Sequence, residues 1–126
     1  MFDLAAAEAE IRAAASDYCV AGIKADIPVL ERIFHEGSHL YASQDGKLIE
    51  WPRQAFLDRV AGRGAVEGEP EFEILSVHFA GPEMAHVHLN MTIPPRVFTD
   101  YLNFLRIDGE WRVIAKIFRV ADGPAV

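Results

Sequence analysis

The stretch DYLNFLRIDGEWRVIAKIF, residues 100–118, decides the fold of this chain. At its centre, Asp108-Gly109 is a two-residue turn signal of the kind that joins antiparallel strands. The residues on either side have the two-residue period of strands with one buried face. We therefore expect a hairpin with strands over residues 97–107 and 111–120.

The length of this turn also predicts which side chains share a face of the hairpin. Regular pairing places Ile107 opposite Glu110 and Leu102 opposite Ala115. One face is then apolar apart from Asp100, and it carries Phe98, Leu102, Phe104, Trp111, Val113, Ala115 and Ile117. The other face carries Thr99, Tyr101, Asn103, Leu105, Arg112, Ile114, Lys116 and Phe118. This second, open face has more apolar bulk than a solvated face needs, so we expect it to form a homodimer with a second copy of the chain.

Outside the hairpin, the spacing of apolar residues predicts three helices. Residues 4–24 are rich in Ala and repeat apolar residues at every third or fourth position, which predicts a long first helix. Asp26 is the expected N-cap of a short second helix, and Gly37 is its expected end. A third helix is expected to begin at Trp51-Pro52 and to end at residues 62–64.

Turn signals and a two-residue period predict the remaining strands. Asp45-Gly46 indicates a small hairpin within residues 39–49. Strand periodicity begins at Glu71, slips once near Leu75 and is regular over residues 85–93. The element order is α-α-β-β-α-β-β-β-β, an α+β fold with three N-terminal helices packed on a mixed or antiparallel sheet. No linker or repeat interrupts it, so residues 1–126 are expected to form one domain.

Composition narrows the class of protein. The chain has 126 residues, a formal net charge of −7 and an isoelectric point near 5.1, which argue against nucleic acid or an anionic membrane as a partner. Apolar residues make up 51% of the chain, which excludes extensive disorder. The single cysteine, Cys19, fits a reducing compartment, and no signal peptide or long apolar run is seen. We expect a cytoplasmic protein.

The histidines do not form a recognisable metal site. Residues 35–39, HEGSH, match the zinc-protease string H-E-x-x-H, but Gly37 would interrupt the helix that the two histidines must share. His86 and His88 share a strand face that His78 could join, yet this set lacks a further ligand at a useful spacing. We therefore predict no metal and no cofactor.

Asp100 is the most informative residue, because it is a carboxylate on an otherwise apolar face. A buried, unpaired carboxylate costs several kcal/mol, so Asp100 must be paired, protonated or functional. Regular register places it diagonal to Arg119, which offers a structural ion pair; the alternative is a role in a pocket. Tyr18, on the buried stripe of the first helix, likewise needs a hydrogen-bond partner.

Three segments together resemble the nuclear transport factor 2-like superfamily, which includes the SnoaL-like and ketosteroid-isomerase-like proteins. They are Tyr18-(x)3-Gly22-(x)3-Asp26, Phe34-His35 and the hairpin of residues 100–118. Within the superfamily, the chain is most similar to the family described as “Putative lumazine-binding”, over residues 4–120. The resemblance implies a cystatin-like cone, in which a curved sheet wraps the first helix around one pocket.

The resemblance also allows a comparison with ketosteroid isomerase. That enzyme forms its oxyanion hole from a tyrosine of the first helix and a protonated aspartate of a late strand. Tyr18 and Asp100 match these two positions and are the candidate catalytic residues. The enzyme's general base falls at Ala42, which cannot accept a proton, so the catalytic set is incomplete.

Three functions remain open at this point. The first is a dimeric protein that binds a small hydrophobic molecule in one apolar pocket, with expected ligand contacts from Tyr41, Phe56, Phe98, Leu102, Trp111 and Arg119. The second is a metal-independent isomerase, dehydratase or cyclase that acts on a hydrophobic or polyketide-like substrate through Asp100. The third is a non-catalytic association module with a filled core. The fold alone is compatible with all three.

Overall fold

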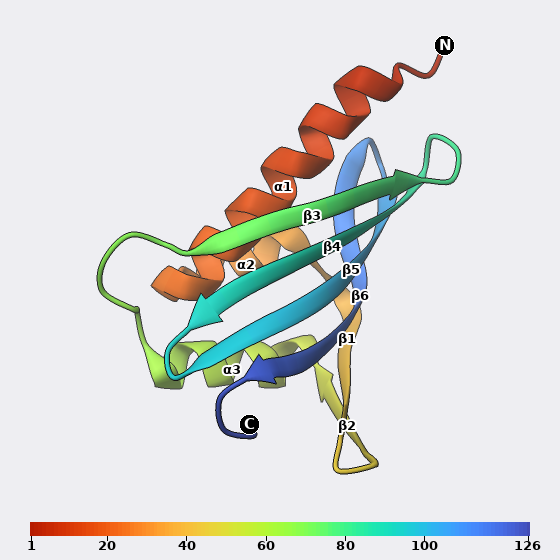
Figure 1. Ribbon diagram of the computed structural model, residues 1–126. Coiled ribbons are helices and arrows are strands. Elements are labelled where there is room, and N and C mark those ends of the chain that lie inside the picture. The colour runs from red at the N-terminus through yellow and green to blue at the C-terminus, as the bar shows by residue number, and fades with distance from the viewer.

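A computed structural model describes residues 1–126 as three helices packed on a six-stranded sheet (Figure 1). The helices are α1 (Leu4–Lys24), α2 (Ile27–Ile33) and α3 (Arg53–Arg63), and the strands are β1 (Phe34–Gln44), β2 (Lys47–Pro52), β3 (Phe72–Phe79), β4 (Met84–Ile93), β5 (Arg96–Ile107) and β6 (Glu110–Asp122). The strand order is β2-β1-β6-β5-β4-β3, with β1 and β6 parallel and every other pair antiparallel. The predicted α+β class and element order are confirmed.

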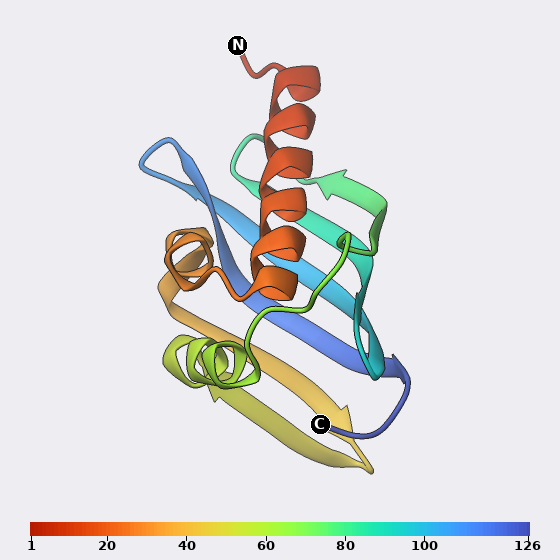
Figure 2. The same cartoon turned by 90° about the vertical axis from the view of Figure 1, so that its left-hand side faces the viewer.

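All three helices lie on one side of the curved sheet, which we call the inner face (Figure 2). The side chain of Asp3 caps α1 by accepting a hydrogen bond from the Ala6 amide at 3.1 Å, and Asp26 caps α2 as predicted. Helix α1 buries one stripe that runs from Ala7 through Ile11 and Ala15 to Gly22. This stripe, rather than helix propensity alone, holds α1 against the sheet. No helix is long and apolar enough to cross a membrane.

Both predicted hairpin turns are confirmed. Asp45 and Gly46 have φ of 54° and 76°, and Asp108 and Gly109 have φ of 51° and 79°, as a type I′ turn requires. The turns pair Gln44 with Lys47 and Ile107 with Glu110. The predicted slip near Leu75 is also confirmed, because the β3–β4 register shifts between Ile74 and Ser76.

The predicted end of the second helix at Gly37 is wrong. Helix α2 ends at Ile33, and Phe34 begins strand β1, where it pairs with Val113. The Phe34 ring packs between those of Tyr18 and Phe56, at centroid distances of 5.6 and 5.1 Å. These tertiary contacts outweigh the local preference for one more helical turn.

The predicted register of the last hairpin is correct near the turn and wrong beyond it. A β-bulge lies between the pairs Phe104–Val113 and Asn103–Ala115, so that Ile114 has no partner on β5. Beyond the bulge, Leu102 pairs with Lys116 rather than with Ala115. The shift by one residue exchanges the two faces of β6. Lys116 and Phe118 therefore lie on the inner face, and Ile117 lies on the outer face.

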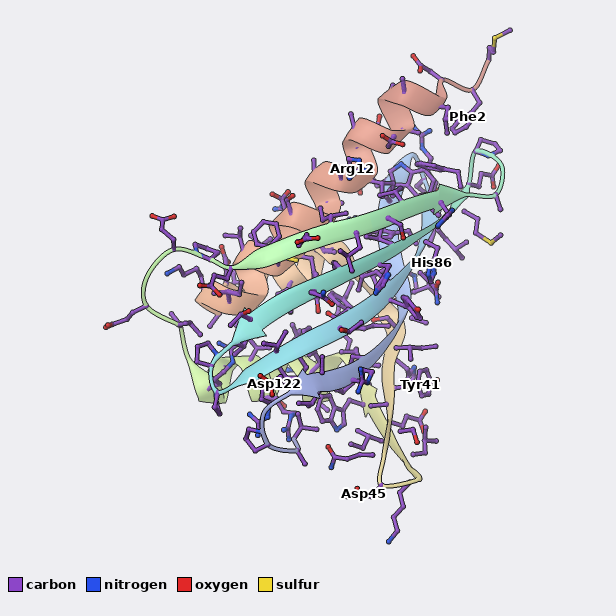
Figure 3. The ribbon with its side chains drawn as sticks, viewed as in Figure 1. Phe2, Arg12, Tyr41, Asp45, His86 and Asp122 are labelled. Carbon is purple, nitrogen blue, oxygen red and sulfur yellow. The ribbon has the colours of Figure 1, made fainter.

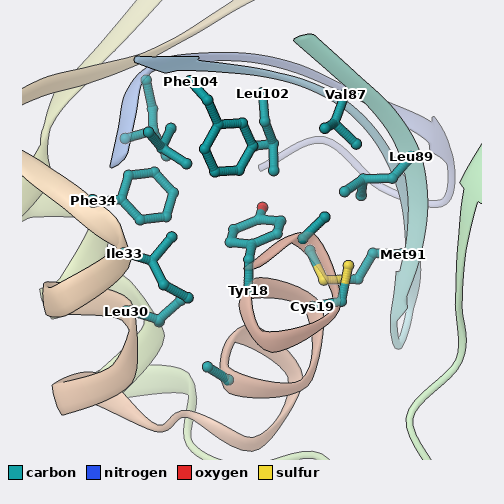
Figure 4. Packing of buried hydrophobic residues seen from close by; sticks show 14 of the residues in the cluster. Tyr18, Cys19, Leu30, Ile33, Phe34, Val87, Leu89, Met91, Leu102 and Phe104 are labelled. Carbon is teal, nitrogen blue, oxygen red and sulfur yellow. The ribbon is translucent and has the colours of Figure 1, made fainter. Parts of the chain in front are cut away.

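The core lies between α1 and the inner face of β4, β5 and β6. Figure 4 shows the Tyr18 ring at its centre, surrounded by residues of α2, β1, β4 and β5, with its hydroxyl directed towards the sheet. Apolar inner-face residues such as Val87, Leu89 and Leu102 are fully buried. The polar residues buried with them are Ser38, Asp100 and Lys116. The regular register predicted an inner face that is apolar apart from Asp100. That prediction is wrong, because Lys116 is buried on the same face.

Candidate functional site

Tyr18, Asp100 and Lys116 meet inside the core from α1, β5 and β6. The Tyr18 hydroxyl donates a hydrogen bond to Asp100 Oδ2 at 2.5 Å, and Lys116 Nζ donates to Tyr18 Oη at 2.7 Å. Lys116 Nζ also lies 3.6 Å from Asp100 Oδ2, which makes an ion pair. Tyr18 and Asp100 are 0% exposed and Lys116 is 5% exposed. We call these residues the buried cluster.

Local structure explains how each member reaches this point. Tyr18 lies on the buried stripe of α1, and Asp100 lies on the inner face of β5 opposite Phe118. Lys116 is inward only because of the bulge at Ile114. The predicted diagonal contact between Asp100 and Arg119 is absent, because Arg119 lies opposite Thr99 and is exposed. The counter-charge of Asp100 is therefore Lys116.

The surroundings of the cluster change its acid–base properties. Burial raises the pKa of Tyr18 well above its ordinary value, and the negative charge of Asp100 raises it further. Burial lowers the pKa of Lys116, while the nearby Asp100 carboxylate opposes that change. Burial also raises the pKa of the Cys19 thiol. Asp100 Oδ1 is buried without a hydrogen-bond partner, so only one oxygen of the carboxylate is satisfied.

A pocket of about 290 Å³ lies next to the cluster, between α3 and strands β2, β4, β5 and β6. Its lining is Trp51, Arg59, Val60, Arg63, Met91, Ile93, Arg96, Phe98, Lys116, Phe118 and Val126. Lys116 is the member of the cluster that reaches the pocket, whereas Tyr18 and Asp100 lie behind it. Lys116 Nζ lies 5.1 Å from the centre of the Phe118 ring, which also lines the pocket, so the amine of the cluster is nearer the pocket lining than its carboxylate is shown to be.

Arginines and aromatic rings shape the rest of the pocket. The Arg59 guanidinium lies 4.3 Å from the centre of the Trp51 ring. The Phe118 ring packs against Trp51 at 5.2 Å and against Phe98 at 6.2 Å. Arg63 is held by the backbone carbonyls of Gly22, Ile23 and Gly64, so it ties α3 to the end of α1.

The predicted ligand-contact residues divide into three groups. Phe98 lines the pocket. Phe56 does not line the pocket, but the centre of its ring lies 4.7 Å from Lys116 Nζ. Leu102 and Trp111 are inner-face residues away from the pocket. Trp111 packs on Phe79 at 5.8 Å, and its indole donates a hydrogen bond to Glu10.

Tyr41 and Arg119 lie on the outer face, away from the pocket. Tyr41 stacks on His39 and projects from the side of β1 that faces away from α3 (Figure 3). Arg119 is on the same face of the sheet through its position in β6. Neither side chain lines the pocket.

The histidines lie on strands. His35 and His39 are both on β1, so the H-E-x-x-H string does not form the helical pair that its chemistry needs. His86 shares a hydrogen bond of 2.8 Å with Asn103 Oδ1 on the outer face. No group of three or more His, Cys, Asp or Glu side chains comes together as a metal site would require.

Sequence reasoning missed most of the pocket. The missed residues are Trp51, Arg59, Val60, Arg63, Met91, Ile93, Arg96, Lys116, Phe118 and Val126. Lys116 and Phe118 were missed because regular pairing assigns them to the outer face. The arginines of α3 follow the ordinary polar pattern of a helix surface, and nothing in the sequence distinguishes Arg59 from a solvated side chain.

Comparisons with known proteins agree with this architecture. A crystal structure of a nuclear transport factor 2-like protein of unknown function from Silicibacter pomeroyi DSS-3 is 28% identical, with a TM-score of 0.87 over 94% of this chain and 99% of that chain. One from Shewanella baltica OS155 is 23% identical, with a TM-score of 0.89 over 98% and 100%. A ketosteroid isomerase-like protein from Erwinia carotovora atroseptica is 16% identical, with a TM-score of 0.71 over 91% and 96%.

A family model identifies the family of this chain, although a comparison with curated proteins found no match. The family described as “Putative lumazine-binding” matches residues 6–119, nearly the whole chain. This chain therefore belongs to the “Putative lumazine-binding” family of the nuclear transport factor 2-like superfamily.

Proposed function

We propose that this protein binds a small, flat and mainly apolar molecule in the pocket between α3 and the sheet. The observation that carries the proposal is the pocket itself, with a volume of about 290 Å³ and seven hydrophobic residues among the eleven that line it. Pockets for small molecules usually have volumes of about 300–1,000 Å³, so this one suits a compact aromatic compound.

The chemistry of the lining supports a flat ligand. Trp51, Phe98 and Phe118 supply ring faces and edges, against which an aromatic ring packs favourably. Lys116 and Arg59 supply hydrogen-bond donors at the floor and wall. A few polar groups in an apolar pocket fix the orientation of a ligand more than they add affinity.

The pocket favours this function over the two alternatives. A non-catalytic association module with a filled core would not need a pocket of this volume. An isomerase, dehydratase or cyclase that works through Asp100 needs that carboxylate within reach of substrate, yet Asp100 does not line the pocket. Lys116 is the one member of the buried cluster that does line it.

A thermal-shift screen of aromatic and polycyclic compounds tests the proposal. A compound at a hundred times its dissociation constant stabilises the folded state by about 2.7 kcal/mol, which raises the melting temperature by several degrees. Ile93→Phe puts a larger, rigid ring into the lining, so it should crowd a bound molecule and reduce the shift. Ile117→Phe is the matched control, because Ile117 is exposed on the outer face. The proposal fails if no compound stabilises the parent, or if the Ile93→Phe protein responds as strongly as the control.

A further inference from the structure

We propose that Lys116 is a reactive amine that forms an imine with an aldehyde or ketone group of the molecule in the pocket, while Tyr18 and Asp100 carry its proton. The inference rests on the proposed function, because the carbonyl compound must occupy the same pocket. It adds a covalent step and a substrate class to that function.

The position of Lys116 is the first argument. It is the only lysine that lines the pocket, and it is 5% exposed. Its Nζ lies 5.1 Å from the centre of the Phe118 ring of the same lining, so a molecule in the pocket lies close to an amine that is almost fully shielded from bulk water. The other lysines are placed differently: Lys24 Nζ donates to the carbonyls of Val66 and Gly68 at 2.8 and 2.6 Å, and Lys47 lies on an exposed hairpin.

The hydrogen bonds of the cluster form a path for the proton. Lys116 Nζ donates to Tyr18 Oη at 2.7 Å, and Tyr18 Oη donates to Asp100 Oδ2 at 2.5 Å. If one proton moves along each hydrogen bond, the ammonium becomes an amine, the carboxylate becomes a carboxylic acid and the tyrosine is unchanged. The net charge of the cluster stays the same, so a free amine forms without releasing a proton to solvent.

Burial makes this exchange accessible. Removing two charges from water costs several kcal/mol for each ion, so a buried ion pair has less advantage over its neutral form than it has at a surface. Burial lowers the pKa of Lys116, although Asp100 opposes the change. Asp100 Oδ1 has no donor, so the carboxylate lacks part of the hydrogen bonding that holds a buried carboxylate charged.

The covalent step balances without an oxidant or reductant. The lone pair of Nζ forms a bond to the carbonyl carbon, the carbonyl π electrons move to the oxygen, and one of the two amine protons passes from Nζ to that oxygen to give a neutral carbinolamine. The proton held by Asp100 passes through Tyr18 to the hydroxyl group, which leaves as water while the nitrogen lone pair forms the C=N bond of a protonated imine. Loss of the remaining N–H proton, back to Asp100, gives the neutral imine. The products are one imine and one water. When the imine is protonated, its positive charge lies beside the Asp100 carboxylate, and this new ion pair replaces the one between Lys116 and Asp100.

Reductive trapping tests the inference directly. The folded protein is incubated at neutral pH with 2-naphthaldehyde and sodium cyanoborohydride, and the alkylated lysines are identified by peptide mass spectrometry. We expect Lys116 to be alkylated at least tenfold faster than Lys47, because the relay supplies a free amine at neutral pH and the pocket holds the aldehyde beside it. Lys24 and Lys47 serve as internal references in every sample.

Two variants separate the proton path from simple exposure. Tyr18→Phe keeps the ring but removes the relay, and it should slow alkylation at Lys116 about tenfold while leaving Lys24 and Lys47 unchanged. Circular dichroism confirms that the variant is folded. Lys116→Met should lose only the adduct at position 116. Alkylation confined to Lys24 and Lys47 in the parent overturns the inference, and an unchanged rate at Lys116 in Tyr18→Phe overturns the role of the relay.

A non-carbonyl analogue distinguishes this inference from the proposed function. If 2-methylnaphthalene raises the melting temperature but 2-naphthaldehyde leaves no adduct on Lys116, the pocket binds and the imine chemistry is wrong. If neither these two compounds nor any other compound of the screen affects the protein at this site, the proposed function and the inference both fail.

Discussion

The contributions of Asp100 and Lys116 to stability depend on each other, because folding removes both charges from water. Their separation of 3.6 Å and the shared contact with the Tyr18 hydroxyl compensate part of the cost of desolvation. Removing one charge leaves the other without compensation. Removing both charges removes the cost of desolvation together with the stabilisation from the ion pair.

A double-mutant cycle measures this dependence. We expect Asp100→Asn and Lys116→Met each to lower the free energy of unfolding by about 3 kcal/mol, the usual cost of breaking a buried pair. The double variant should lose less than either single change, since it leaves no uncompensated charge. Urea unfolding gives the three values. Additive losses would mean that the two groups stabilise the fold independently.

The raised pKa of Tyr18 predicts a loss of stability in alkali. Above about pH 10 a tyrosine in the unfolded chain loses its proton, while buried Tyr18 keeps its own, so the folded state binds more protons and stability falls as pH rises. The lowered pKa of Lys116 acts in the opposite direction, but only up to about pH 10.4, where the unfolded lysine also becomes neutral.

The matched variant Tyr18→Phe isolates this effect. Urea unfolding between about pH 10 and about pH 11 should show a steeper decline for the parent than for the variant. Absorbance of ionised tyrosine should accordingly show that Tyr18 keeps its proton above about pH 10 as long as the chain is folded, because burial raises its pKa. Equal slopes for the two proteins would contradict burial of the Tyr18 hydroxyl.

Elements with strong local signals were predictable from the sequence, and the bulge in β6 was not. Asp45-Gly46 and Asp108-Gly109 specify their turns through backbone conformations that few residues adopt, and Asp26 specifies a helix start. Ile114 carries no such signal. It is extruded because the inner face of a sheet curved around α1 must present Val113 and Lys116 in the same direction, a requirement of the tertiary fold. Tyr18 and Asp100 were therefore predicted, and their partner Lys116 was not.

The bulge gives a prediction for two deletions of the same residue type. Deleting Ile114 should leave a regular ladder in which Phe104 still pairs with Val113 and Lys116 stays inward, at a cost of about 1 kcal/mol, a typical value for a single change. Deleting Ile117 should instead move Phe118 to the outer face and cost more than about 4 kcal/mol.

Both deletion variants are compared by urea unfolding and by near-ultraviolet circular dichroism, which reports the packing of aromatic side chains. If the Ile114 deletion is the more harmful of the two, the bulge is not the feature that turns Lys116 inward.

At the scale of the whole molecule, the sheet has one face covered by helices and one without any covering element (Figures 1 and 2). The uncovered face carries Tyr101, Leu105 and Ile117, which are among the exposed large apolar residues of the chain. The true register places Ile117 there in place of Phe118. Tyr101 and Ile117 are direct neighbours across β5 and β6. Large exposed apolar side chains on an uncovered sheet face are typical of association surfaces, so the homodimer expected from the sequence remains our prediction.

Ile117→Glu tests the dimer, because the side chain is 51% exposed and the change places a charge on the uncovered face without touching the core. Light scattering after gel filtration should give the mass of a dimer for the parent and of a monomer for the variant. Leu4→Glu is the control: Leu4 is 55% exposed but lies on α1, on the opposite side of the sheet, so this variant should remain a dimer. A parent that is monomeric at every concentration, or a control that dissociates as readily as Ile117→Glu, would show that the uncovered face does not join two copies.

Because the pocket and the buried cluster are built within one chain, the monomeric variant should still bind the same compounds as the parent.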